Sequence, residues 1–231
     1  MEKSDYWIDF WKNYGKESKE DDPQKQVLRT INQDSISEEL WKFTVKEIEE
    51  QIEPNIDDRL LELCCGNGLI SRYFSPLCKH ITSVDVSEDL VALIDKNQYS
   101  NIEPIVSDIR NLDFTDKVFS KVIIYAGIQY LTLSESVILL EKVFRWLKPG
   151  GCIFLGDIPN YNKKWEFYNN SERHFIYFKN LKEGKSIVGT WYEPSFFKNL
   201  SRVLGFRKSI FLPQNSKLIY SNYRYDFKLI K

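Results

Sequence analysis

The fold of this chain is decided by the stretch Leu60-Leu-Glu-Leu-Cys-Cys-Gly-Asn-Gly-Leu-Ile-Ser71. An apolar run with strand character carries an acid near its end, passes through a turn of small residues and opens a helix. Glycine at positions 66 and 68 permits positive φ and lets a ligand approach main-chain N–H groups without a Cβ in the way. The helix directs the positive end of its dipole at the same place. The stretch therefore predicts a nucleotide-binding strand, turn and helix.

A second acid supports this interpretation. Another apolar run, residues 81–85, ends in Asp85, 17 residues after Gly68. A carboxylate there can accept hydrogen bonds from the hydroxyls of a ribose. Two ligands fit: a dinucleotide and S-adenosylmethionine. A dinucleotide fingerprint needs a third small residue, which Ser71 supplies poorly, and usually a second catalytic domain, so a NAD-dependent oxidoreductase is disfavoured.

Five segments in order resemble the class I S-adenosylmethionine-dependent methyltransferases. They are residues 62–68, Asp85, and residues 107–109, 119–125 and 147–155. The resemblance implies an α/β fold: a doubly wound, Rossmann-like, seven-stranded sheet, mostly parallel with an antiparallel last strand. The chain departs from the family pattern at one position, because Cys64 stands where the first glycine is usual. A side chain there predicts that residue 64 avoids positive φ.

The resemblance also implies S-adenosylmethionine as the cofactor and assigns residues to it. Glu62 would orient the turn toward the methionine ammonium, Asp85 would bind the ribose, and Asp108 would meet the adenine amino group. Tyr125 is predicted to contact the cofactor because it ends the fourth strand, and open α/β sheets bind ligands at the carboxyl ends of their strands. Arg29 would pair with the cofactor's carboxylate or with the substrate, although a surface salt bridge is an equal alternative. The full predicted set is Arg29, Glu62, Cys64, Gly66, Asn67, Gly68, Asp85, Val86, Asp108, Ile109 and Tyr125.

The chain divides into an N-terminal part and a methyltransferase domain. Residues 1–58 are expected to form a helical cap over the cofactor, with helices over 5–15 and 35–52, and residues 59–231 to form the domain. Residues 159–192 interrupt the rhythm of strands and helices with aromatic residues and lysines, and are expected to be a lid over the substrate. The predicted strands are 59–64, 81–86, 102–107, 118–125, 152–158, 206–212 and 223–230, and the predicted helices of the domain are 68–76, 88–97, 134–147 and 194–204.

Composition limits the partners. The net charge of −1 argues against a nucleic-acid-binding protein. Residues 1–58 carry −8 and residues 159–231 carry +9, which suits an anionic small molecule or a sugar nucleotide, or an ordinary lysine-rich surface. No apolar run approaches the roughly 18 residues that cross a bilayer, so we expect no membrane partner. The four cysteines lack metal-ligand spacing, and the first residues do not resemble a secretion signal, so we expect a cytoplasmic enzyme with reduced thiols and no metal.

The reaction predicted is methyl transfer to oxygen on a small molecule. Residues 156–160, 189–192 and 222–226 resemble methyltransferases associated with surface-polysaccharide gene sets, which implies a sugar or a sugar-linked substituent as acceptor. An N-methyltransferase and a non-catalytic, cofactor-binding partner protein are the alternatives. A general base is needed for an oxygen acceptor of high pKa. His174, in the lid, and Asp157, at the end of the fifth strand, are the predicted catalytic residues.

Overall fold

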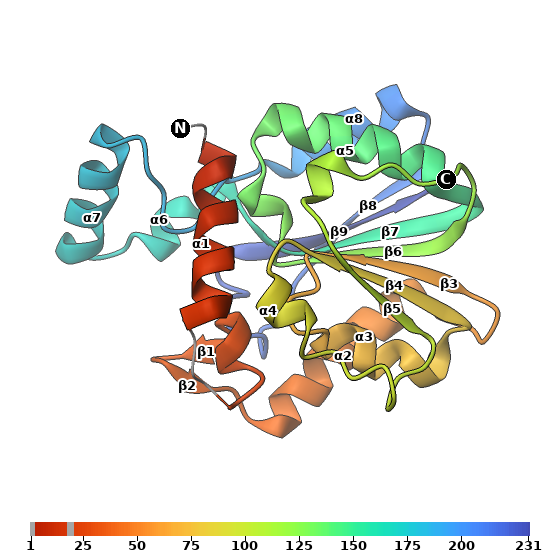
Figure 1. Ribbon diagram of the computed structural model, residues 1–231. Coiled ribbons are helices and arrows are strands. Elements are labelled where there is room, and N and C mark those ends of the chain that lie inside the picture. The colour runs from red at the N-terminus through yellow and green to blue at the C-terminus, as the bar shows by residue number, and fades with distance from the viewer. Residues whose placement is uncertain (1–2, 18–20) are drawn as a thin grey trace.

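Seven strands form one sheet in the computed structural model, which describes residues 3–17 and 21–231 (Figure 1). Their order is β5-β4-β3-β6-β7-β9-β8. The strands β3 to β7 are parallel, and the last strand, β9, runs antiparallel to both of its neighbours. The predicted fold class is therefore confirmed. The strands are β3 (Arg59–Leu63), β4 (His80–Asp85), β5 (Ile102–Val106), β6 (Phe119–Tyr125), β7 (Leu147–Pro159), β8 (Lys208–Pro213) and β9 (Arg224–Ile230).

Helices cover both faces of the sheet. In Figure 1, α2 and α3 lie on one face and α5 and α8 on the other. Side chains alternate between these faces along each strand: Leu61 and Leu63 pack in the core that contains Trp146 of α5, whereas Leu60 packs in the core that contains Ile48 of α2. The helices are α1 (Lys3–Glu17), α2 (Glu38–Ile52), α3 (Leu69–Phe74), α4 (Glu88–Val91), α5 (Leu133–Trp146), α6 (Lys164–Phe167), α7 (Ser171–Lys182) and α8 (Pro194–Leu204), with 3₁₀ turns η1 (Lys25–Val27), η2 (Ser75–Leu77), η3 (Ile109–Asn111), η4 (Ile128–Tyr130) and η5 (Tyr161–Lys163).

Capping residues explain where most helices begin and end. The Ser37 side chain accepts a hydrogen bond from Leu40 N at the start of α2, and Thr132 forms a capping box with Glu135 at the start of α5. Gly205, with φ of 88°, ends α8 as predicted. The helix predicted over 88–97 is wrong beyond Val91, because turns follow, one of them closed by a hydrogen bond from Asn97 N to Asp95 Oδ1.

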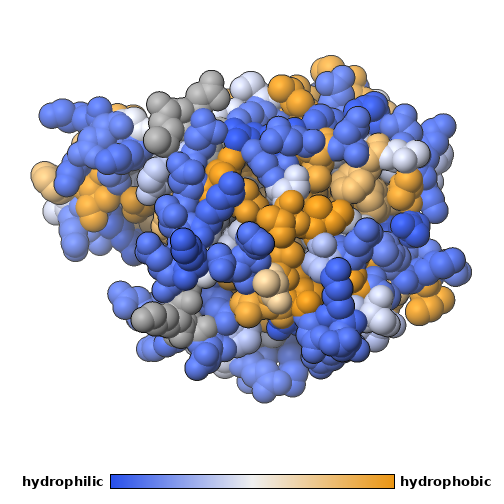
Figure 2. Space-filling model, viewed as in Figure 1, coloured by the Kyte–Doolittle hydropathy of each residue, from blue (hydrophilic) through white to orange (hydrophobic). Residues whose placement is uncertain are grey.

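The elements that cover neither face of the sheet lie at one end of it. Helix α1 stands across this end, and a small hairpin, β1 (Thr30–Ile31) with β2 (Asp34–Ser35), lies beneath it (Figure 1). Helices α6 and α7 form an arm that projects beside α1. Figure 2 shows apolar surface gathered beside α1 and a smaller group on this arm. No helix among the described residues is long and apolar enough to cross a membrane.

The prediction for Cys64 is wrong: its φ is 59°, in the left-handed region. The reason is the sharp reversal after β3, where Cys65 N donates to Val84 O (3.0 Å) and Gly68 N donates to Cys65 O (2.9 Å). The side chain of Cys64 is accommodated because Gly127 lies opposite it. A Cβ on Gly127 would come within 2.6 Å of Cys64 Cβ and 2.8 Å of its Sγ. The cysteine thus takes the space that a side chain at 127 would need.

Gly127→Ala should therefore lower the free energy of unfolding by about 1–3 kcal/mol through overpacking. The φ of Gly127 is −120°, so the alanine backbone itself is permitted. Cys64→Gly in the same chain removes the clashing atoms and should restore part of the loss. Urea denaturation of wild type, both single variants and the double variant measures this coupling. Strictly additive effects would show that the two positions do not compete for space.

Candidate functional site

A cavity of about 730 Å³ lies at the carboxyl ends of the parallel strands, beneath α1. This volume suits a cofactor and a small substrate. Of the eleven residues predicted to hold a cofactor, ten line it: Arg29, Glu62, Cys64, Gly66, Asn67, Asp85, Val86, Asp108, Ile109 and Tyr125. Gly68 does not line it and instead begins α3, with φ of 77°. Predicted residues that are spread over nearly a hundred positions of the sequence therefore surround one cavity.

The glycine turn is shaped by what packs behind it. Gly66 has φ of 54°, and a Cβ on it would meet Val27 at 2.7 Å. A Cβ on Gly68 would meet Ile94 at 2.8 Å. Asn67 is buried, and its Nδ2 donates to Pro23 O and to Gln26 Oε1, both at 2.8 Å. The turn is therefore held against the segment that leads into the β1–β2 hairpin.

Asp85, the last residue of β4, joins two loops at the floor of the cavity. Its Oδ2 accepts a hydrogen bond from Gly66 N (2.8 Å), and its Oδ1 accepts one from Ser87 N (2.9 Å). The side chain is buried, and this burial raises its pKa, although both N–H donors oppose the shift. Each carboxylate oxygen keeps a lone pair for a further donor.

Glu62, in β3, is buried below the turn. Its Oε2 accepts a hydrogen bond from Ser71 Oγ, and Ser71 Oγ also contacts Ser83 Oγ at 2.5 Å. Burial raises the pKa of Glu62 to about 8, and the nearby Asp85 acts in the same direction. Burial thus favours the protonated form of this carboxyl group.

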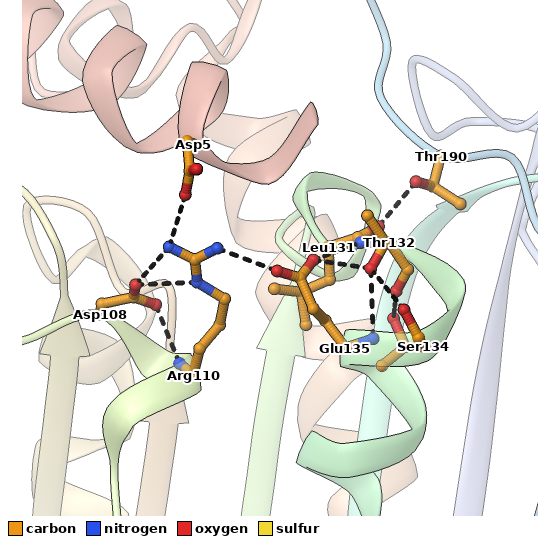
Figure 3. A network of polar contacts seen from close by, with 9 residues as sticks. Asp5, Asp108, Arg110, Leu131, Thr132, Ser134, Glu135 and Thr190 are labelled. Carbon is orange, nitrogen blue, oxygen red and sulfur yellow. Dashed lines mark hydrogen bonds and ion pairs between the residues drawn. The ribbon is translucent and has the colours of Figure 1, made fainter. Parts of the chain in front are cut away.

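Arg110 joins three acidic groups beside the cavity (Figure 3). Its guanidinium pairs with Asp108 at 2.7 Å, with Glu135 at 2.9 Å and with Asp5 of α1 at 3.0 Å. Asp108 also accepts from Arg110 N (2.9 Å) and so caps η3. Asp108 is thus held in place by the residue two positions further along, while it lines the cavity next to Ile109.

Arg29 stands over an aromatic pair. Its guanidinium lies 4.6 Å from the ring centre of Tyr125 and 5.2 Å from that of Trp41. Cation–π contact of this kind holds the plane of an arginine while its N–H groups stay available. Tyr125 is buried, and its pKa is raised by that burial.

Asp157 is aimed into the cavity by an irregular backbone. It has φ of 59° and lies where the register between β7 and β9 shifts, between Leu155 and Ile158. Its Oδ2 pairs with Arg224 at 3.1 Å, and Gln214 Nε2 donates to its Oδ1 at 3.3 Å. The neighbouring Asp226 accepts from Asp157 N (2.7 Å), and burial raises the pKa of Asp226 to about 7.

The two histidines lie away from this cavity. His174 is exposed on α7, with its ring 5.9 Å from that of Trp165, and is not among the lining residues. Its neighbour Arg173 does line the cavity. His80 begins β4, at the opposite end of the strand from Asp85, and its Nε2 lies 3.1 Å from Glu103.

An aromatic wall was missed from the sequence. Tyr130 lies against Trp7 (4.8 Å between ring centres) and Trp11 (5.7 Å), so α1 closes the cavity over η4. Tyr220 and Tyr223 line the cavity from the segment before β9. The aromatic helix predicted over 5–15 and the Tyr-Arg-Tyr run at 223–225 were the available signals, but neither has a spacing that identifies a ligand.

Two cysteines, Cys64 and Cys65, line the cavity. Burial raises the pKa of Cys64 and of Cys65, which keeps both thiols protonated. Across residues 3–17 and 21–231, no group of three or more His, Cys, Asp or Glu side chains is placed to hold a metal ion.

Part of this chain is similar to known methyltransferases. Residues 60–151 match the family model described as a methyltransferase domain. An uncharacterized methyltransferase of Schizosaccharomyces pombe is 31% identical over 108 residues, which cover 43% of this chain and 38% of that protein. A ubiquinone/menaquinone biosynthesis C-methyltransferase of Ectopseudomonas mendocina is 28% identical over 124 residues, covering 50% and 46%. The matches thus span less than half the length of these curated relatives.

A solved structure shares the fold over nearly the whole chain. Phosphoethanolamine N-methyltransferase 1 of Haemonchus contortus, in complex with phosphoethanolamine and S-adenosylhomocysteine, superposes with a TM-score of 0.72. The superposition covers 99% of this chain and 48% of that one, at 14% identity. The likeness to this structure therefore extends well beyond residues 60–151, which the family model matches.

The buried Glu62 gives a prediction for stability. Its pKa of about 8 in the folded protein exceeds the unfolded value near 4.5, so the folded state binds more protons between these limits. Stability should fall as pH rises from 5 to 8, by on the order of 3 kcal/mol from this group. Glu62→Gln imitates the protonated form and should remove this contribution, leaving those of Asp85 and Asp226, whose pKa values burial also raises.

Urea denaturation across this pH range measures the effect. Glu50→Gln, which changes an exposed glutamate on α2, is the matched control and should keep the wild-type slope. A Glu62→Gln variant with an unchanged slope would contradict the assignment.

Proposed function

We propose that this protein transfers a methyl group from S-adenosylmethionine to a small-molecule acceptor. One observation carries the proposal: the glycine turn after β3, Asp85 after β4 and Asp108 after β5 all line the same cavity. Three neighbouring strand ends thus present a close-approach turn and two carboxylates in the order that the family motifs have in the sequence. The domain match over residues 60–151 supports it.

The residues present fit the nucleoside part of the cofactor. Asp85 lines the cavity and would accept hydrogen bonds from ribose hydroxyls, and Gly66 lines the cavity beside it without a side chain. Val86 and Ile109 supply apolar surface for an adenine ring, and Asp108 supplies an acceptor for its amino group.

The methionine part of the cofactor would bind at the other side of the turn. Arg29, in cation–π contact with Tyr125, would offer N–H donors to the carboxylate. Glu62 would interact with the ammonium, and this positive charge would favour its ionised form. Residues 1–58 would then act as the cap and residues 159–192 as the substrate lid, in keeping with α1 and Arg173 at the cavity.

Bound S-adenosylmethionine would supply an activated methyl group on a sulfonium. The protein's own task is then to position the acceptor in line with that group and to exclude water. The aromatic wall of Trp7, Trp11 and Tyr130 suits the exclusion of water, since all three side chains line the cavity. Oxygen on a sugar stays the predicted acceptor atom. The relatives' names, which include a C-methyltransferase and an N-methyltransferase, do not favour it.

Asp157 is the better placed of the two predicted bases. It lines the cavity at the carboxyl end of β7, where its backbone conformation turns the carboxylate inward. His174 lies on the exposed arm, outside the lining residues. We therefore propose Asp157 as the group that takes the acceptor's proton.

Asp85→Ala should weaken the binding of S-adenosylhomocysteine by roughly 2–4 kcal/mol, or about 30- to 1,000-fold in Kd, because two hydrogen bonds to a carboxylate are lost. Isothermal titration calorimetry measures the Kd, and thermal unfolding checks that the variant is folded. Asp89→Ala removes an exposed carboxylate from α4 and is the matched control. Failure of the wild type to bind either S-adenosylmethionine or S-adenosylhomocysteine would refute the proposed function.

Asp157→Asn should reduce turnover by roughly 10²–10⁴-fold while the affinity for S-adenosylhomocysteine stays close to wild type. His174→Ala should retain turnover. Mass spectrometry of a panel of sugar nucleotides and phosphorylated small molecules, searched for the gain of one methyl group, identifies the acceptor and then measures the rate. Binding of the cofactor without turnover of any acceptor would favour the non-catalytic alternative. Loss of activity in His174→Ala alone would instead assign the role of general base to His174.

A further inference from the structure

Arg224 brings a buried positive charge to the wall of the cavity. It is the first residue of β9, and because β9 is antiparallel to β7, its amino end lies beside the carboxyl end of β7. The side chain is 10% exposed. Its Nη1 donates to Asp157 O (2.6 Å) and lies 3.1 Å from Asp157 Oδ2. Its Nε is buried and has no hydrogen-bond partner among the described residues.

This unpartnered Nε indicates a missing acceptor. A buried donor without a partner costs about 1–3 kcal/mol, and more when it is charged. The guanidinium lies 5.2 Å from the ring centre of Tyr220 and 5.5 Å from that of Tyr223, within cation–π range of both. Burial raises the pKa of Tyr223 to about 12, so its hydroxyl keeps a proton to donate. The wall therefore offers donors from an arginine and a tyrosine.

Two arginines, Arg29 and Arg224, line this part of the cavity, and Asp157 is the carboxylate that pairs with Arg224. A neutral acceptor would leave the Nε of Arg224 without a hydrogen-bond acceptor.

We propose that the acceptor carries an anionic group, a carboxylate or a phosphate, which binds to Arg224 and Tyr223 on the wall of the cavity. This inference rests on the proposed function for the statement that the bound molecule is the methyl acceptor. Arg29 is left for the methionine carboxylate. The anion would place the rest of the acceptor beside Asp157, which lies in the bulge of β7.

The test uses inorganic phosphate and acetate as separate probes. Each is titrated into the full chain at constant ionic strength, with and without S-adenosylhomocysteine, and followed by calorimetry. We expect saturable binding of at least one of them to the wild type, and the stronger of the two identifies the class of anion. Arg224→Gln should weaken that binding at least about tenfold, because a charge-assisted hydrogen bond is lost. Arg224→Lys should restore part of it.

Arg202→Gln is the matched control, because it removes an exposed arginine from α8 and should change the affinity less than about twofold. Thermal unfolding shows whether Arg224→Gln is folded. If it is not, Tyr223→Phe takes its place in the test and should weaken the binding of the same anion. Equal affinity in wild type and Arg224→Gln, or no saturable binding of either anion to wild type, overturns the inference. Anion binding as expected without any binding of S-adenosylhomocysteine would instead refute the proposed function alone.

Discussion

The carboxylate of Asp85 is the interaction on which the rest of the site depends. It accepts one hydrogen bond from the turn after β3 and one from the start of α4, and so fixes the ends of two neighbouring strands relative to each other. A buried carboxylate is costly unless it is hydrogen-bonded, so the turn must present Gly66 N to it. That demand sets the sharp reversal after β3, the positive φ at Cys64 and Gly66, and the direction of α3.

Three strand ends that face the cavity have strained backbone. Cys64 follows β3, Ala126 follows β6 and Asp157 lies in the bulge of β7, and all three have positive φ although they carry side chains. Such conformations cost of order 1–3 kcal/mol each and persist when neighbouring structure fixes them. Here Ala126 N donates to Gly156 O (2.9 Å) and Asp157 N donates to Asp226 Oδ1 (2.7 Å). The sheet therefore supports the irregular geometry that turns Asp157 toward the cavity.

The sheet and the nucleoside side of the site could be predicted from the sequence because both are local signals. Apolar runs that end in acids define β3 and β4, and the carboxyl ends of parallel strands meet at one edge, which places Asp85 and Asp108 together. The conformation of Cys64 was predicted wrongly because residues with a side chain usually avoid positive φ. Here the space for that side chain is supplied by Gly127, which is 63 residues away in the sequence. Arg224 was missed for a similar reason. Its place depends on the antiparallel direction of β9 and on pairing with β7, neither of which local spacing reveals.

Helix α1, which covers the cavity, is attached close to Asp85 at the floor of the cavity. The ion pair between Asp5 and Arg110 is half exposed at the Asp5 side chain and contributes at most about 1 kcal/mol. The contacts of Trp7 and Trp11 with Tyr130 bury far more apolar surface and dominate the attachment of α1 at one end. At the other end, a Cβ on Gly15 would lie 2.2 Å from Ser87 Oγ, so α1 rests directly on the residue that caps α4. Ser87 N is also a donor to Asp85. Ser87 is therefore in direct contact both with the Asp85 carboxylate and with the helix that covers the cavity.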